Sequence, residues 1–493
     1  MEVAITIDSR SSAPLHRQVY EEVRSAILTG RLAAGSRVPS TRALAHSLGI
    51  SRATVTQSYE QLLAEGYLQA ATGSGTFVAR HLPDDLLRPA AVRQVLPAGQ
   101  STRRTIRLSR YGKSVAEAEL YEPAGAEPLI SFKYGRPALD KFPLPLWRRL
   151  LARHCRAGEP ARLDYAADSL GYRPLREAIS RYLGRARAVQ CEPSQVIIVG
   201  GSQQAIDLIT RVLVDRGETV AIEDPGYLGA RRAFLAQGAR LWPAPVDESG
   251  LVVERLRARS SVEPRLVYVT PSHQFPTGAV LSLPRRLELL AWAEETGATI
   301  VEDDYDSEYR YSGRPLPALQ GLDRSGSVIY VGTFSKVLFP ALRVGYLVAP
   351  ANLTRVLGRA KWLVDRQPPA FEQGALTDFI NEGHLDRHIR RMRTLYDQRR
   401  QTLVRALQQH LGDHVTILGE NAGMHLLARI RTELADAEVV RRAEQVDVGL
   451  ASAQPNYLKD RRAGEFVFGY AALSERKIKE GVRRLAGALH DGG

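Results

Sequence analysis

The residues that could do chemistry in this 493-residue chain each follow or end an apolar segment. Thr333-Phe334-Ser335-Lys336 ends one such segment, and Arg343 lies seven residues beyond the lysine. The other three groups are Glu302-Asp303-Asp304-Tyr305, Gly200-Gly201-Ser202-Gln203-Gln204 and Glu223-Asp224-Pro225-Gly226-Tyr227. If the apolar segments are strands of an open α/β sheet, all four groups meet at the sheet edge where such folds bind ligands.

Together these groups match the requirements of pyridoxal phosphate. A lysine forms a Schiff base with the aldehyde, an acid keeps the pyridine nitrogen protonated, and an aromatic ring stacks on the pyridine. Hydroxyl groups, backbone N–H groups at a helix start and an arginine hold the phosphate. Each group has a plainer interpretation, namely a solvated lysine, an acidic loop or Mg²⁺ site, and an ordinary helix cap. Their conjunction at strand ends favours the cofactor, with Lys336 as the Schiff-base residue.

A second group of residues, near the N-terminus, indicates DNA reading. Leu15, Val19, Val23 and Ile27 predict one helix, Ser40 caps a second that ends at Gly49, and Ser51 caps a third. The third helix would lie in the major groove, as the second helix of a helix-turn-helix does. We expect DNA contacts from Arg42, Ser51, Arg52 and Thr56, and from a hairpin wing turning at Gly73 and Gly75. The alternative is a helical docking domain whose arginines are merely solvated.

The elements that must position these residues fall into three parts. We predict that residues 1–79 form the small DNA-binding domain. Residues 80–125 are predicted to form a basic linker rich in proline, alanine and arginine. Residues 126–493 predict an α/β domain with a smaller C-terminal subdomain from about residue 351. Its buried strands are expected at Gln195–Val199, Thr219–Glu223, Arg265–Thr270, Thr299–Asp303, Ser327–Thr333 and Val344–Ala349, which indicates a largely parallel sheet wrapped by helices.

Composition restricts the class of protein further. The net charge of +13 suits a partner such as nucleic acid. The two cysteines, Cys155 and Cys191, cannot form a disulfide framework, and no Cys/His metal spacing occurs, so no metal site is expected. We find no apolar run of about 18 residues and no secretion signal, which predicts a cytoplasmic protein without a membrane span.

The motifs PSTRALA, SRATV, EGY and GSGTFV resemble the GntR family of bacterial regulators over about residues 10–80. From about residue 128 onward the chain resembles the fold-type I aminotransferases. The combination, with TPSHQFPTG and EDDYDSEYRY, resembles the MocR/GabR subgroup of transcription regulators.

This resemblance implies a role for each candidate residue. Lys336 would bind the cofactor covalently, Asp303 would face the pyridine nitrogen, Tyr305 the phenolic oxygen, and Tyr227 would stack on the ring. The choice between Asp303 and Asp304 stays open, although the spacing to Lys336 favours Asp303. Five residues would surround the phosphate: Ser202, Gln203, Thr333, Ser335 and Arg343. The resemblance also implies a domain-swapped homodimer that binds double-stranded DNA and responds to a small amine, an amino acid or pyridoxal phosphate itself.

Two positions depart from the pattern of working aminotransferases. Phe275 stands where those enzymes usually carry Asn, and Val467 stands where they carry the Arg that grips the substrate carboxylate. Arg461 and Arg462 lie nearby but out of register. A regulator with no efficient catalytic cycle is therefore the preferred interpretation, and an active aminotransferase with an accessory DNA-binding module is the alternative.

Overall fold

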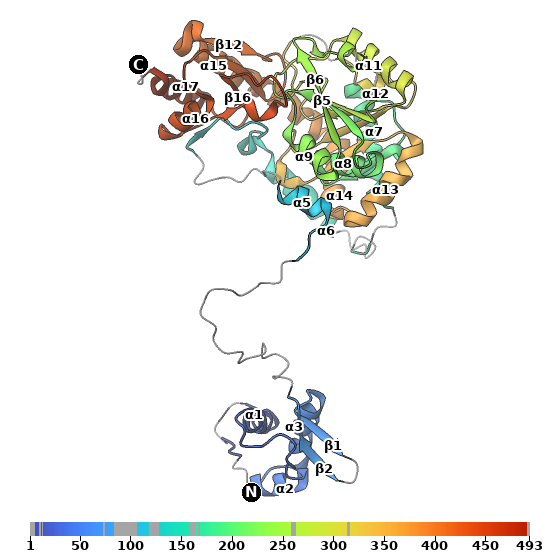
Figure 1. Ribbon diagram of the computed structural model, residues 1–493, viewed down its shortest axis with the longest axis vertical. Coiled ribbons are helices and arrows are strands. Elements are labelled where there is room, and N and C mark those ends of the chain that lie inside the picture. Colours follow the sequence, from blue (N-terminus) through green and yellow to red (C-terminus); the bar gives the residue numbers. More distant parts are fainter. Residues whose placement is uncertain are drawn as a thin grey trace. The chain divides into compact units, whose positions relative to one another are not determined.

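The computed structural model of the chain is shown in Figure 1. It describes residues 5–8, 11, 13–71, 74–82, 106–117, 128–156, 163–165, 168–257, 263–312 and 316–490. The chain divides into two compact units, residues 1–106 and 107–493. In the part of the chain that is described, none of the helices is long and apolar enough to span a bilayer.

The N-terminal unit is a winged helix-turn-helix, as predicted. Its helices are α1 (Leu15–Leu28), α2 (Thr41–Leu48) and α3 (Arg52–Ala64), and its wing is the antiparallel hairpin of β1 (Leu68–Ala71) and β2 (Gly75–Val78). Both predicted caps are present, because Ser40 Oγ accepts from the Ala43 amide and Ser51 Oγ accepts from the Thr54 amide. Gly49 ends α2 with a φ of 63°, a conformation that glycine adopts without strain.

One apolar core holds this unit together. Val19, Val23 and Ile27 are buried as the four-residue spacing predicts, and they pack with Val55, Tyr59 and Leu62 of α3. Leu15 was expected on the same buried face, but 41% of its surface is exposed. It is the first residue of α1, at the edge of the core. Gly75 lies so close to Arg37 that a Cβ there would be 2.8 Å from the guanidinium Nε.

The C-terminal unit is built on an eight-stranded sheet in the order β4-β11-β10-β9-β8-β5-β6-β7. All six predicted strands are present, and their bounds are β4 Val196–Val199, β5 Thr219–Asp224, β8 Leu266–Val269, β9 Thr299–Asp304, β10 Val328–Thr333 and β11 Gly345–Val348. The strands from β10 to β6 are parallel, whereas β11 is antiparallel to both neighbours. Sequence analysis missed β6 (Arg240–Asp247) and β7 (Gly250–Leu251), because β6 contains two prolines and is only partly buried.

Helices cover both faces of this sheet, as Figure 1 shows. The strand residues alternate between two layers, so that Ile197, Ile329 and Leu347 meet α8 (Ser202–Leu213), α9 (Leu228–Gln237) and α13 (Ala351–Asp365). The opposite face packs against α6 (Leu144–Arg156), α7 (Arg173–Arg187), α10 (Glu254–Arg257), α11 (Leu283–Thr296), α12 (Leu319–Leu322) and α14 (Ala370–Asn381). This double coverage explains why the strands read as continuous apolar runs.

The smaller subdomain has an antiparallel sheet in the order β12-β13-β16-β15. Its elements are α15 (His384–Leu411), β12 (Val415–Leu418), β13 (His425–Ile430), α16 (Asp436–Gln445), β14 (Val448–Gly449), β15 (Ala451–Ser452), β16 (Glu465–Gly469) and α17 (Glu475–His490). The smaller subdomain was expected to begin at about residue 351. In the structure α13 and α14 pack against the large sheet instead, so the helices just after residue 351 belong to the larger part of the unit. In addition, β3 (Ile130–Ser131), from far earlier in the chain, pairs in parallel with β14.

The predicted linker, residues 80–125, lies mostly outside the described residues. Within it, α5 (Arg110–Ala116) packs against α9, and the guanidinium of Arg211 lies 5.8 Å from the centre of the Tyr111 ring. Part of this segment is therefore ordered on the C-terminal unit.

Two leucines of α11 test the core on this face of the sheet. Leu289 is fully buried, whereas Leu287 is 52% exposed on the same helix. We expect Leu289→Ala to lower the free energy of unfolding by about 2–5 kcal/mol, since it removes buried methyl groups and leaves a cavity. Leu287→Ala should cost less than about 1 kcal/mol. Urea unfolding of the two variants checks this, and equal losses would contradict the packing described.

Candidate functional site

The nine residues predicted to bind the cofactor all line one cavity of about 200 Å³ at the carboxyl ends of the parallel strands. They come from the start of α8, the start of α9, the end of β9, and the end of β10 with the loop that follows it. The set is Ser202, Gln203, Tyr227, Asp303, Tyr305, Thr333, Ser335, Lys336 and Arg343. Strand-end geometry thus brings together four segments that are separated by up to about 140 residues of sequence.

Lys336 is held at the cavity wall by backbone. Its Nζ donates a hydrogen bond to the Gly135 carbonyl oxygen at 2.9 Å. Gly135 has a φ of 76°, which strains any residue with a Cβ, and a Cβ there would lie 2.6 Å from Nζ and would displace it. Burial lowers the pKa of Lys336, and the carboxylates of Asp306 and Asp303 oppose this shift. A lowered pKa increases the fraction of free amine, which is the nucleophilic form.

The two adjacent aspartates of β9 point to opposite faces of the sheet. Asp303 faces the cavity and accepts a hydrogen bond from Tyr268 Oη at 2.6 Å. Burial raises the pKa of Asp303 to about 7, while the Tyr268 hydrogen bond acts in the opposite direction. Asp304 instead forms a buried ion pair with Arg187 at 2.8 Å and accepts from Tyr330 Oη at 2.6 Å. Of the pair left open by the sequence, Asp303 is the residue in the cavity.

The polar atoms around the start of α8 fit a phosphate group. Gly201, with a φ of 115°, precedes the helix, and a Cβ there would lie 3.2 Å from the guanidinium nitrogens of Arg343. The N-terminus of α8, Ser202 and Arg343 therefore present donors to one volume. Ser335 Oγ and Asp303 Oδ1 are buried without a hydrogen-bond partner. Buried polar atoms are usually hydrogen-bonded, so a bound ligand would supply the missing partners. These features fit pyridoxal phosphate at both its phosphate and its ring nitrogen.

Aromatic side chains surround the remaining part of the cavity. Phe275 is buried there, 4.7 Å from the Tyr134 ring centre and 6.0 Å from that of Tyr227. Tyr305 lines the cavity, but its hydroxyl donates to the His273 carbonyl oxygen at 2.8 Å. A Cβ on Gly229 would clash with the Tyr227 ring at 2.5 Å, so Gly229 permits the position of that ring.

Sequence analysis missed several residues of the cavity, including Tyr134, Gly135, Tyr268, Asp306, Met424 and His425. Tyr268 could have been found, because it lies within a predicted strand beside β9 and its alternation places it on one face. Asp306 was part of the quoted EDDYDSEYRY motif but was given no role. Tyr134 and His425 carry no local signal, since they reach the cavity only through the tertiary fold.

No arginine occupies position 467, where aminotransferases usually carry the arginine that binds the substrate carboxylate. Val467 on β16 is buried in an apolar cluster with Leu427, Ala453 and Tyr457. Arg461 and Arg462 line other surface hollows and are not among the residues of this cavity. Among the described lining residues, Arg343 is the one guanidinium. An incoming carboxylate would therefore have to share the arginine that the phosphate would use.

The predicted DNA-contact residues lie in the N-terminal unit. Arg42 and Arg52 are exposed at the first turns of α2 and α3, and Arg52 Nε lies 3.4 Å from Thr41 Oγ1. Ser51 is the α3 cap and is exposed, whereas Thr56 is partly buried. Gly75 begins β2, and Gly73 lies outside the described residues. Arg52 is thus at the end of α3 that a helix-turn-helix directs toward base edges, and Arg42 is at the start of the preceding helix.

Comparison with known proteins agrees with this two-part organisation. Residues 15–78 match the family of bacterial regulatory proteins described as the gntR family, and residues 128–485 match aminotransferase class I and II. The chain is 40% identical to the probable rhizopine catabolism regulatory protein MocR of Rhizobium meliloti, covering 98% of this chain and 96% of that one. It is 34% identical to the HTH-type transcriptional regulator TauR of Rhodobacter capsulatus, covering 99% and 100%.

A solved structure with a bound pyridoxyl compound is also similar to this chain. The α-aminoadipate aminotransferase LysN of Thermus thermophilus, complexed with N-(5'-phosphopyridoxyl)-L-leucine, is 33% identical. The match has a TM-score of 0.68 and covers 73% of this chain and 92% of that one. The aminotransferase fold and this pyridoxyl complex imply pyridoxal phosphate as the cofactor.

The two aspartates of β9 predict opposite effects on stability. Because the pKa of Asp303 in the fold is about 7, above its unfolded value of ~3.9, its contribution falls as pH rises through that interval. In the cofactor-free protein, Asp303→Asn should therefore gain stability relative to the parent as pH rises from 4 to 8. Asp304, whose pKa is lowered against burial by Arg187, contributes stability at neutral pH.

Asp304→Asn is the matched comparison and should cost about 3–5 kcal/mol at pH 7, since it leaves Arg187 buried without its carboxylate. Urea unfolding at a series of pH values measures both effects. The assignment is wrong if Asp303→Asn is the more destabilised of the two at pH 8.

Proposed function

This chain belongs to the MocR/GabR group of GntR-type regulators, in which a winged helix-turn-helix is joined to an aminotransferase-like domain, and we propose that it is a pyridoxal-phosphate-dependent transcription regulator that senses a small amine. The observation that carries the proposal is the meeting of all nine candidate residues in one cavity of a chain that also has a DNA-reading unit. A DNA-binding regulator of a bacterium acts in the cytoplasm.

The residues have distinct tasks in this proposal. The start of α8, Ser335 and Arg343 hold the phosphate, and Asp303, supported by Tyr268, holds the proton of the ring nitrogen. Lys336 provides the amine for covalent attachment, and Gly135 orients it. When bound there, pyridoxal phosphate supplies an aldehyde that condenses with primary amines. Phe275 and Tyr134 exclude water from the space beside it.

The sensing role is favoured over an active aminotransferase by what surrounds Val467. A complete cycle needs an anchor for the carboxylates of two successive substrates, and an apolar cluster occupies that position. The chain would therefore hold an amine without turning it over rapidly. We further propose a domain-swapped homodimer as the DNA-bound form, because one winged helix reads few base pairs and symmetric half-sites need two readers.

The cofactor assignment is tested with Lys336→Ala. The purified full-length protein should absorb in the near-ultraviolet to visible range, and borohydride reduction should attach the cofactor to the peptide containing Lys336. Lys336→Ala should lose the attachment, and the cofactor-free forms of the variant and the parent should unfold at similar midpoints, because the hydrogen bond that Nζ donates goes to a backbone carbonyl. Lys361→Ala, which changes a lysine outside the cavity, is the control for attachment and should retain it. Attachment at any other lysine would refute the assignment.

The DNA-reading assignment is tested with three arginines of the N-terminal unit. Arg52→Ala should lose about 1–3 kcal/mol of discrimination between operator and unrelated DNA if it contacts a guanine edge. Arg42→Ala should weaken binding to all sequences and flatten the salt dependence. Arg17→Ala removes the same charge from α1, where Arg17 pairs with Glu21, and should have little effect. Fluorescence anisotropy at several salt concentrations separates these outcomes, and equal effects of all three changes would contradict the proposed orientation.

A further inference from the structure

A buried polar cluster borders the cavity beside Lys336. It consists of His273, Asp306 and His425, and one polar atom from each lies within 4.8 Å of the others. Asp306 and His425 line the cavity, and the rings of His273 and His425 have centres 4.6 Å apart. No residue of this cluster takes part in the cofactor contacts proposed above, although Asp306 is the largest electrostatic influence opposing the lowered pKa of Lys336.

Each member of the cluster has one buried polar atom without a partner: Asp306 Oδ1, His425 Nε2 and His273 Nε2. The other oxygen of Asp306 is occupied, because Oδ2 accepts from the Met424 amide at 3.2 Å and lies 3.1 Å from His273 Nδ1. The carboxylate is therefore held in place with Oδ1 left for another group. An unpaired buried carboxylate oxygen is costly, which indicates that something else completes this site.

The unpartnered atoms of Asp306 and His425 are hydrogen-bond acceptors. Burial and the neighbouring His273 lower the pKa of His425 well below its usual value, so its ring is neutral. A neutral ring carries one proton, and His425 bonds with the Pro276 carbonyl, which can only accept, so that proton is on Nδ1 and Nε2 is an acceptor. The Tyr305 hydroxyl proton goes to the His273 carbonyl, which leaves His273 Nδ1 to donate to Asp306.

The two acceptors, Asp306 Oδ1 and His425 Nε2, require donors from a ligand. A hydroxyl or a second ammonium group supplies them, and a carboxylate does not, since it would place its own lone pairs against Asp306. The only guanidinium among the described lining residues, Arg343, belongs with the phosphate-binding elements. Tyr134, Phe275 and Met424 provide apolar surface beside the cluster for a short carbon skeleton.

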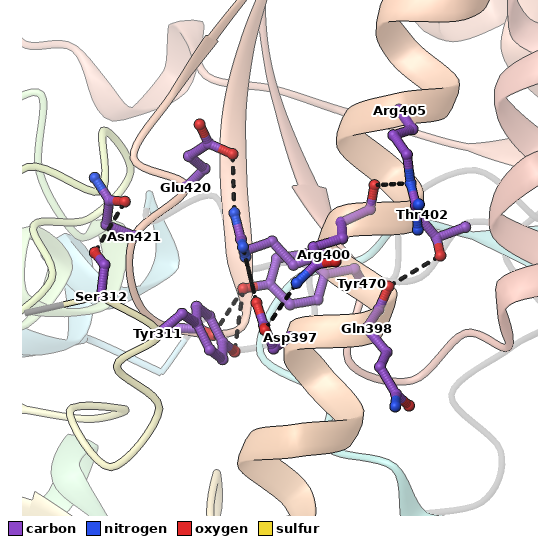
Figure 2. Close-up of polar contacts among 12 residues, drawn as sticks. Tyr311, Ser312, Asp397, Gln398, Arg400, Thr402, Arg405, Glu420, Asn421 and Tyr470 are labelled. Atoms are coloured by element: carbon purple, nitrogen blue, oxygen red, sulfur yellow. Dashed lines mark hydrogen bonds and ion pairs between the residues drawn. The ribbon is translucent and has the colours of Figure 1, made fainter.

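The smaller subdomain holds this side of the cavity in place. The Gly423 carbonyl accepts from Tyr311 Oη at 2.6 Å and Tyr470 Oη at 2.8 Å. Figure 2 shows how Arg400 of α15 supports the same region, bonding to Asp397 and Glu420 beside the Tyr311 ring. Gly423 directly precedes Met424 and His425, which belong to the smaller subdomain. Asp306 follows β9 of the large sheet and accepts from the Met424 amide, so the polar cluster connects the two parts.

We propose that His425 and Asp306, with His273 as a positioning residue, recognise the effector through a hydrogen-bond-donating group, so that the effector is an amine bearing a hydroxyl or a second amino group and no carboxylate. This rests on the proposed function, in which the effector's primary amine meets the cofactor at Lys336.

The test uses the full-length protein loaded with pyridoxal phosphate and four matched probes. These are propylamine, 3-amino-1-propanol, 1,3-diaminopropane and 3-aminopropanoate, each titrated while the cofactor absorbance is followed. The amino alcohol, the diamine or both should half-saturate at concentrations about ten- to a hundredfold below propylamine, as expected for a buried hydrogen bond to a charged or imidazole acceptor. 3-Aminopropanoate should bind no more tightly than propylamine. Comparing the amino alcohol with the diamine also shows whether the site prefers a hydroxyl or a second ammonium group.

Variants assign the preference to the cluster. His425→Phe should reduce the advantage of the amino alcohol at least fivefold, and Asp306→Asn should do the same for the diamine, while propylamine is affected less. Asp378→Asn is the matched control, since Asp378 pairs with His154 at 3.0 Å and does not line the cavity. If a variant fails to fold, the probe series on the unaltered protein still decides the matter.

Three results would overturn the proposal: tighter binding of 3-aminopropanoate, no spectral response to any probe, or Zn²⁺ binding that depends on the same three residues. Failure of the proposed function looks different, because the protein would then lack the Lys336-linked absorbance before any probe is added.

Discussion

Two neighbouring carboxylates on β9 are buried on opposite faces of one sheet, and the site depends on keeping their roles apart. Side chains of a strand alternate, so Asp303 and Asp304 cannot both reach the cavity. On the far face, Asp304 forms an ion pair with Arg187 and accepts a hydrogen bond from Tyr330, and these contacts hold the end of β9 in place. Asp303 is left with a single donor, Tyr268, and an unpartnered oxygen. The fold thus pairs Asp304 with Arg187 and keeps Asp303 at the cavity, where a ligand can reach it.

The parallel direction of β5, β8, β9 and β10 supplies the rest of the arrangement. Their carboxyl ends share an edge, where Lys336, Asp303 and Tyr227 line the cavity. The smaller subdomain adds His425 and Met424 from β13 and the preceding loop, while Gly135 comes from the segment after β3. A ligand in this cavity therefore touches parts of the chain that belong to different packing layers.

Sequence patterns predicted the elements well where local signals were strong. Continuous apolar runs located six buried strands, and polar groups at their ends located nine cavity residues. The patterns failed where tertiary contacts decide. The prolines of β6 concealed an only partly buried strand, and the pairing of β3 with β14 links residues too far apart for any local period to reveal. The same reason hid His425 and Tyr134, since neither lies in a motif. The separation of Asp303 from Asp304 followed only once the packing of Arg187 was known.

The pairing of β3 with β14 has a mechanical consequence. The chain leaving α5 is attached at one end to the large body, through the contact of α5 with α9, and at the other to the small body, through β3. Ala116 at the end of α5 and Ile130 at the start of β3 are 14 residues apart in sequence, so they can lie at most about 50 Å from each other. Any displacement of the smaller subdomain against the large one changes the distance between Ala116 and Ile130. None of the described residues of α5 is buried, whereas Ile130 of β3 is 2% exposed, so the contact of α5 with α9 buries less of the chain than the pairing of β3 with β14 does.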